Sequence, residues 1–99
     1  MNIFDIINQP EHEEITTVLA QNKNARIVQI ISNGQTSDWY DQNETEFVIL
    51  LQGTAIIEFE NQKTIKLSKG DTCLIQPHEK HRVSHTSNNP ECIWICVFF

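Results

Sequence analysis

From residue 26 to residue 99, short apolar segments alternate with polar turns, and this repetition is the strongest constraint on the fold. The segments are rich in Val, Ile, Thr and aromatic residues, and they comprise residues 26–32, 46–51, 54–60, 64–67, 72–76, 82–86 and 92–99. Connectors such as NGQTSD, ENQK and SNNPE have the composition of turns. Seven short strands with no helix between them predict an antiparallel sandwich or barrel.

Two of these segments indicate how the strands are buried. In TAIIEFE, Ala55, Ile57 and Phe59 fall on one face, whereas the other face carries Thr and Glu. This alternation is typical of a strand with one face on a core and the other in solvent. The segment CIWICVFF, residues 92–99, is apolar on both faces. We therefore expect it to be covered on both sides.

The first twenty residues carry a different pattern. Pro10 is followed by three glutamates within four residues, and Ile15, Val18 and Leu19 then recur at helical spacing. This pattern predicts one short helix. We expect residues 1–24 to form a helical or irregular segment packed on the barrel, and residues 25–99 to form the barrel domain.

The bulk composition excludes several classes of protein. A chain of 99 residues makes one domain. The net charge is −6 and the seven Lys and Arg are scattered, which weighs against nucleic acid because phosphate contacts need clustered basic residues. No apolar run approaches the ~20 residues of a membrane span, and the acidic first residues lack the basic region of a signal peptide. We expect a cytoplasmic protein that binds neither nucleic acid nor membrane.

The three cysteines fit that expectation. An odd number of cysteines argues against a disulfide framework and suits a reducing compartment. All three lie in apolar runs, so we interpret them as small buried hydrophobic residues.

Three of the four histidines lie within eight residues, at His78, His81 and His85. On a strand, His81 and His85 are ~13 Å apart, too far for one ion when Zn–N bonds are ~2.0 Å. A helix would let them share zinc as in HExxH proteins. Pro77 and the β-branched Val83 disfavour a helix, and the glutamate of that motif is missing. His78 belongs to the preceding turn, so a His78–His81 pair remains geometrically possible.

Further ligands must come from another part of the chain. The stretch WYDQNETE offers Asp41, Glu44 and Glu46 beside two aromatic residues. Carboxylates of this kind are competent ligands for divalent ions.

Together, these two stretches resemble the cupin superfamily, a group of small β-barrels with two motifs. Glu46-FVILLQ-Gly53 reproduces the E-x6-G half of the first motif. The stretch from Gly70 through His81 to His85 reproduces the spacing of the second motif. The resemblance covers about residues 25–99 and implies an antiparallel double-stranded β-helix, the jelly-roll or cupin barrel.

The His-x-His pair of the first cupin motif is absent here. With four residues before Glu46, its two positions fall on Trp39 and Asp41. With three residues, they fall on Tyr40 and Gln42. The two alignments place different side chains in the barrel.

In cupins with the full motif, histidines and a glutamate hold a divalent metal such as Mn, Fe, Ni or Zn. The resemblance therefore implies a metal site made of Asp41, Glu46 and His81, with His78 or Gln42 as a possible fourth ligand. Two carboxylates and one imidazole form a hard site, which favours Mn or Fe(II) over Cu.

Two functions follow from the resemblance. The first is a metal-dependent small-molecule enzyme of the dioxygenase, isomerase or lyase type, in which Tyr40, His78 and His85 are the candidates for proton transfer. The second is a non-catalytic cupin that binds a small ligand and has lost the full metal motif. In either case we expect a small-molecule ligand or substrate, and a homodimer formed through strands near the chain ends.

Overall fold

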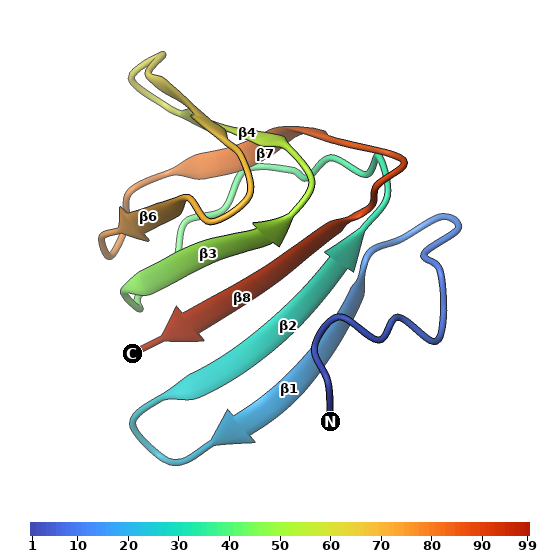
Figure 1. The fold of residues 1–99 in the computed structure, drawn as a ribbon. Helices are drawn as coiled ribbons and strands as arrows, with labels where there is room; N and C mark the ends of the chain where they lie inside the picture. Colours follow the sequence, from blue (N-terminus) through green and yellow to red (C-terminus); the bar gives the residue numbers. More distant parts are fainter.

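A computed structural model describes all of residues 1–99. The protein has eight strands in two antiparallel sheets (Figure 1). In chain order the strands are β1 (Ile15–Gln21), β2 (Arg26–Ser32), β3 (Glu46–Gln52), β4 (Ala55–Phe59), β5 (Thr64–Leu67), β6 (Thr72–Ile75), β7 (His81–Thr86) and β8 (Cys92–Phe98). One sheet has the order β1-β2-β8-β3-β6 and the other β5-β4-β7. The predicted antiparallel all-β fold is confirmed.

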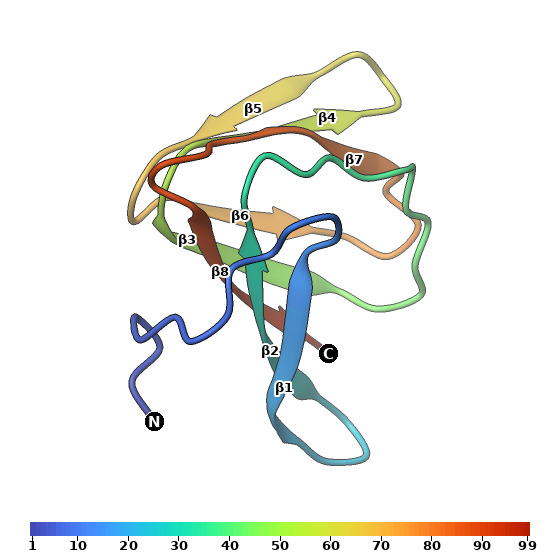
Figure 2. The ribbon, with the colours of Figure 1, turned by 90° about the vertical axis from the view of Figure 1, so that its right-hand side faces the viewer.

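The core lies between the two sheets. Figure 2 shows β5, β4 and β7 above the strands of the larger sheet. On β4, Ala55, Ile57 and Phe59 are all buried in this core, as the alternation in the sequence predicts. Leu50 of β3 and Trp94 of β8 pack in the same cluster. The protein has no helix with the length and apolar character needed to cross a membrane.

Strand β8 lies between β2 and β3 in the middle of the larger sheet, and its first three residues are buried. Trp94 faces the core, and Ile93, whose side chain points to the opposite face, is also fully buried. On the neighbouring strand, the side-chain amide of Gln29 donates to the carbonyl of Ile3 at 2.8 Å. This bond ties the first residues of the chain to the larger sheet.

The predicted N-terminal helix is wrong. Residues 15–21 form β1, which pairs antiparallel with β2 from Ile15 opposite Ile31 to Gln21 opposite Arg26. Four consecutive β-branched residues, at positions 15–18, lose side-chain freedom in a helix and suit a strand. Asn22 closes the hairpin by accepting hydrogen bonds from the two backbone amides that follow Lys23. Pairing with the free edge of β2 therefore outweighs the helix-start signal at residues 10–14.

Gly53 of the E-x6-G spacing has a local structural role. It follows β3 with φ +91°, a conformation that side chains rarely adopt. A Cβ atom at this position would lie 2.7 Å from Oγ of Ser87 and 2.8 Å from Sγ of Cys92. The turn into β4 therefore requires glycine.

Candidate functional site

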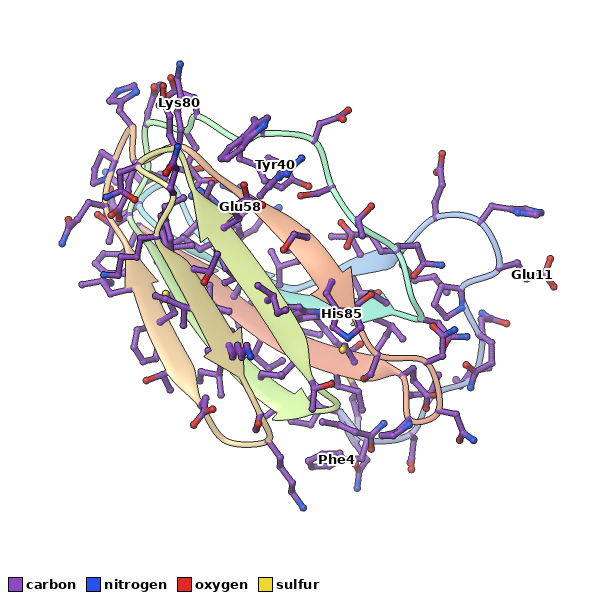
Figure 3. The ribbon with its side chains drawn as sticks, turned by 90° about the horizontal axis from the view of Figure 1, so that it is seen from above. Phe4, Glu11, Tyr40, Glu58, Lys80 and His85 are labelled. Atoms are coloured by element: carbon purple, nitrogen blue, oxygen red, sulfur yellow. The ribbon has the colours of Figure 1, made fainter.

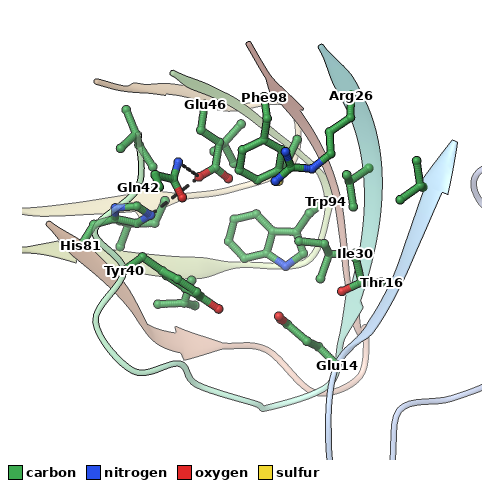
Figure 4. Close-up of a pocket in the computed structure, with 17 residues that line it drawn as sticks. Glu14, Thr16, Arg26, Ile30, Tyr40, Gln42, Glu46, His81, Trp94 and Phe98 are labelled. Atoms are coloured by element: carbon green, nitrogen blue, oxygen red, sulfur yellow. Dashed lines mark hydrogen bonds and ion pairs between the residues drawn. The ribbon is translucent and has the colours of Figure 1, made fainter. Parts of the chain in front are cut away.

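A cavity of about 270 Å³ lies between the sheets and opens at one side of the barrel (Figure 4). Most of its wall is apolar and comes from both sheets, with Val28 and Ile30 on β2, Val48 on β3, Ile57 on β4, and Trp94 and Phe98 on β8. Polar side chains enter this apolar space from only a few positions. Those positions decide what the cavity can bind.

One end of the cavity is formed by Gln42, Glu46 and His81, which we call the polar end. Glu46 opens β3 and is 8% exposed, and His81 opens β7 and is 4% exposed. Tyr40 and His81 exchange two backbone hydrogen bonds, of 2.7 and 3.2 Å, which hold the loop before β3 against β7. Gln42 on this loop donates through Nε2 to Oε1 of Glu46 at 3.0 Å.

The hydrogen bonds of His81 determine which of its ring nitrogens carries the proton. Nδ1 lies 2.9 Å from the carbonyl oxygen of Glu79, which can only accept, so Nδ1 donates. Nε2 faces Oε1 of Glu46 at 3.7 Å. No hydrogen bond joins Nε2 to the carboxylate, because 3.7 Å is too long for one. With the proton on Nδ1, the neutral imidazole presents its Nε2 lone pair to the same gap as the Glu46 carboxylate.

Glu14 and Tyr40 lie across the cavity from each other, with their oxygens pointing inward (Figure 4). Burial raises the pKa of the Glu14 carboxyl above its ordinary value, and the charge of Glu46 raises it further. The pKa of the Tyr40 phenol is also raised, first by burial and then by the charge of Glu14. Burial is the larger cause of both shifts, and the charge of a nearby glutamate adds to each.

Arg26 also lines the cavity, but its guanidinium is already engaged. Its Nη1 lies 2.5 Å from Oε2 of Glu44, and its Cζ lies 4.1 Å from the centre of the Phe98 ring. Neither Glu14 nor Glu46 forms an ion pair with a lysine or arginine. The cavity thus contains two carboxylates without a lysine or arginine partner.

The three cysteines are free and buried, as the sequence predicts. Cys96 lines the cavity, and burial raises the pKa of its thiol well above the ordinary value, with a further increase from the charge of Glu46. The thiol therefore stays protonated and contributes a small neutral surface.

The predicted metal ligands do not all meet. Glu46 and His81 lie together, but Asp41 instead accepts from Nδ1 of His78 at 2.8 Å in an exposed pair outside the cavity. Tyr40 and Gln42 point into the cavity, and Asp41 between them points away. The second alignment of the missing His-x-His pair is therefore the one that the structure adopts.

The donor set does not fit the metal centre of a full-motif cupin. No three His, Cys, Asp or Glu side chains are close enough together to hold an ion. The two histidine positions of the first motif are taken by Tyr40 and Gln42, which leaves Glu46 and His81 as the two ligands that remain from the cupin motifs. A catalytic metal site ordinarily has three protein ligands and an open position.

Of the three candidates for proton transfer, only Tyr40 lines the cavity. His78 lies in the exposed turn before β7 with φ +61°. His85 is exposed on the outer face of the three-stranded sheet, which Figure 3 views from above together with Glu58. Neither His78 nor His85 lines the cavity, so neither can transfer a proton to a molecule bound there.

A register shift between β4 and β7 explains the position of His85. Val83 pairs with Ile57, whose side chain is buried, whereas His85 pairs with Ile56. The irregularity falls between these two pairs, so the alternation that turns His81 and Val83 inward is broken before His85. Sequence alternation alone places all three residues on one face.

Glu14 and Arg26 were not expected in the cavity. The sequence around Glu14 predicted a helix start, and Glu14 enters the cavity only because β1 forms beside β2. A strand-like alternation over residues 14–18 places Glu14, Thr16 and Val18 on one face, and all three line the cavity.

Trp39, an aromatic residue near the first motif, lies outside the cavity. Its ring contacts the Arg82 guanidinium, with 4.9 Å between Cζ and the ring centre.

Residues 27–98 match the family model of the cupin domain. A crystal structure from Ralstonia eutropha JMP134, provisionally described as a mannose-6-phosphate isomerase, has a TM-score of 0.92 at 32% identity, over 99% of this chain and 94% of that one. A cupin superfamily protein from Desulfitobacterium hafniense DCB-2 has a TM-score of 0.81 at 19% identity, over 94% and 83% of the two chains.

Similarity also extends to L-ectoine synthases. The protein from Rhodococcus opacus (strain B4) is 33% identical over 69 residues, which is 69% of this chain and 50% of that protein. The one from Rhodococcus jostii (strain RHA1) matches to the same extent. This chain spans about half the length of these curated relatives.

Proposed function

This chain belongs to the cupin family, and we propose that its barrel binds one small organic molecule through the polar end of the cavity. The observation that carries the proposal is the gap between Nε2 of His81 and Oε1 of Glu46, two acceptors 3.7 Å apart in an apolar cavity. A ligand that donates into this gap satisfies both atoms at once.

The access of this pair to the cavity supports a binding role. His81 and Glu46 are almost fully buried as residues, yet no side-chain nitrogen or oxygen that is sealed from solvent lacks a hydrogen-bond partner. Nε2 of His81 is therefore open to the cavity, where water fits the gap beside Glu46. A ligand that makes the same hydrogen bonds can replace this water.

The size of the cavity limits the ligand. At roughly 30 Å³ for each water molecule in the liquid, a cavity of about 270 Å³ holds about nine waters. This volume is at the small end of the range for ligand pockets, about 300–1,000 Å³. The site therefore suits a compact molecule with an apolar body and one polar head group.

A metal-dependent enzyme is the competing function. Two observations favour it: Nδ1 of His81 is held by a backbone carbonyl, as in many metal-binding histidines, and named enzymes are among the similar proteins. The donor set argues against it, because only Glu46 and His81 remain from the cupin motifs and no three His, Cys, Asp or Glu side chains lie close enough together to hold an ion.

Elemental mass spectrometry of the untagged protein separates the two functions. Asp41→Ala is the matched control, because Asp41 lies outside the cavity. Stoichiometric metal in the wild type and in Asp41→Ala, lost in Glu46→Gln and His81→Ala, would establish the metal site and overturn the metal-free proposal. We expect no stoichiometric metal in any of the four proteins.

Ligand binding is tested with four compounds that share a benzene ring and differ in one substituent: toluene, benzyl alcohol, benzylamine and benzoate. Trp39→Phe leaves the cavity residue Trp94 as the sole tryptophan, so its fluorescence reports occupancy. Val28→Phe, made in this background, fills the cavity, and Ile27→Phe on the opposite face of β2 is the control. We expect saturable binding that Val28→Phe abolishes and Ile27→Phe retains. If none of the four compounds binds, the proposal fails.

A further inference from the structure

We infer that the molecule bound in the barrel is a primary amine, held as its ammonium ion between Glu46 and His81. This inference rests on the proposed function and adds the chemical class of the ligand. It comes from the number of hydrogens that the polar end requires and from the charge of the cavity.

The first argument counts hydrogens. Oε1 of Glu46 and Nε2 of His81 both accept and lie 3.7 Å apart. One atom placed about 2.8 Å from each can satisfy both only if it carries at least two hydrogens. A hydroxyl carries one hydrogen and a carboxylate carries none, whereas a carboxamide nitrogen carries two and an ammonium carries three. The charge of the cavity distinguishes the ammonium from the neutral carboxamide. Gln42 adds an acceptor, since its amide nitrogen already donates to Glu46 and leaves the amide oxygen free.

The second argument concerns charge. Glu46 lies at the polar end and Glu14 at the opposite side of the opening, and neither has a lysine or arginine partner. Arg26, the one lysine or arginine that lines the cavity, is paired with Glu44. A cation is therefore attracted to this cavity and an organic anion is repelled. The charge of Glu46 also raises the pKa of Glu14, in addition to the larger effect of burial.

The third argument concerns the walls. Tyr40 and Trp94 both line the cavity, and no lysine or arginine side chain lies over either ring. An ammonium or its polarised methylene group near an aromatic face is attracted by the ring quadrupole. Apolar walls with two carboxylates and free aromatic faces favour an amine with a short apolar body.

The test compares benzylamine, benzyl alcohol, toluene and benzoate at pH 7.5 in the Trp39→Phe protein, by fluorescence and by isothermal titration calorimetry. A charge-assisted hydrogen bond is roughly twice as strong as a neutral one, which predicts that benzylamine binds about tenfold more tightly than benzyl alcohol. We expect benzoate to bind most weakly.

Two variants test which carboxylate causes the preference for benzylamine. Glu46→Gln should reduce the benzylamine-to-toluene affinity ratio at least tenfold while toluene still binds, which shows that the cavity is intact. Glu14→Gln is a milder second variant and should weaken benzylamine a few-fold without changing toluene. Glu58→Gln, on the outer face of the three-stranded sheet, is the control and should change neither affinity.

The outcomes distinguish this inference from the proposed function. If toluene or benzyl alcohol binds as tightly as benzylamine, the cavity is a binding site but the amine inference is overturned. Preferred binding of benzoate overturns it as well. Stoichiometric metal at Glu46 and His81 also overturns it, because the ion would occupy the ammonium position. If nothing binds, both proposals fall.

Discussion

Replacing Glu46 by Gln tests the protonation assigned to His81, because the two possible states predict changes of opposite sign. In the structure, Oε1 of Glu46 accepts from Gln42 at 3.0 Å and faces Nε2 of His81 at 3.7 Å. A glutamine whose amide nitrogen takes the position of Oε1 can donate to the Nε2 lone pair after a shift of less than about 1 Å. The same nitrogen keeps a hydrogen bond to Gln42 when the Gln42 amide turns its oxygen toward it.

The expected magnitude follows from burial. Glu46 is 8% exposed, so the substitution removes a buried charge and adds a hydrogen bond between neutral groups. Such a bond contributes about 0.5–1.5 kcal/mol, and relief of carboxylate desolvation acts in the same direction. We expect the free energy of unfolding without ligand to rise by about 1–2 kcal/mol. A change of 1 kcal/mol corresponds to about 4–8 °C in Tm for a domain of this size.

The opposite assignment gives the opposite result. If Nε2 carried a proton and formed a buried ion pair with Glu46, removal of the charge would cost about 3–5 kcal/mol. Urea unfolding followed by circular dichroism measures the difference at pH 7. Glu58→Gln is the control, because its partially exposed pair with Arg82 is worth about 0–1 kcal/mol. Destabilisation of Glu46→Gln by more than 2 kcal/mol beyond this control would refute the neutral assignment.

Three further predictions concern stability and assembly. The pKa of the Glu14 carboxyl is raised above 4.5 in the folded protein, so the folded state binds the carboxyl proton more tightly than the unfolded chain does. The stability of the fold therefore decreases as the pH rises from the unfolded pKa through the raised, folded pKa. Glu14→Gln should therefore raise Tm at pH 7 and lose this advantage below about pH 4. Ser32→Ala removes the acceptor, at 3.0 Å, of the buried Trp94 indole N–H; urea unfolding should show a loss of about 1–3 kcal/mol, and a loss below 0.5 kcal/mol would mean that the N–H finds another partner. The expected homodimer should appear as twice the 11.5 kDa chain mass in light scattering after size exclusion, and a species of chain mass alone would contradict it.

The strands from β2 onward could be predicted because their signal is local. Alternation of apolar and polar residues in β4, and turn residues between segments, depend only on neighbours in the chain. Gly53 is likewise specified locally, since the turn needs positive φ. The pairing of Glu46 with His81 followed from motif spacing and a resemblance, and the structure places the two side chains together.

Three features were decided only by contacts between distant parts of the chain. Residues 15–21 are a strand because the edge of β2 was available for pairing, although the preceding residues carry a helix-start signal. His85 faces outward because the β4–β7 register shifts between Ile57 and Ile56. Asp41 points away from the cavity because the Tyr40–His81 bridge sets the face of that loop.

By itself, the sequence determined the all-β class and most of the strands, because alternation and turn chemistry act between near neighbours. The motif resemblance named all three residues of the polar end among its candidate ligands. The tertiary structure decided which polar side chains share the cavity, because a shift of one residue in pairing turns a side chain to the opposite face. The expected site had three metal ligands, whereas the structure brings together only the Glu46 carboxylate and the His81 imidazole, which face one gap.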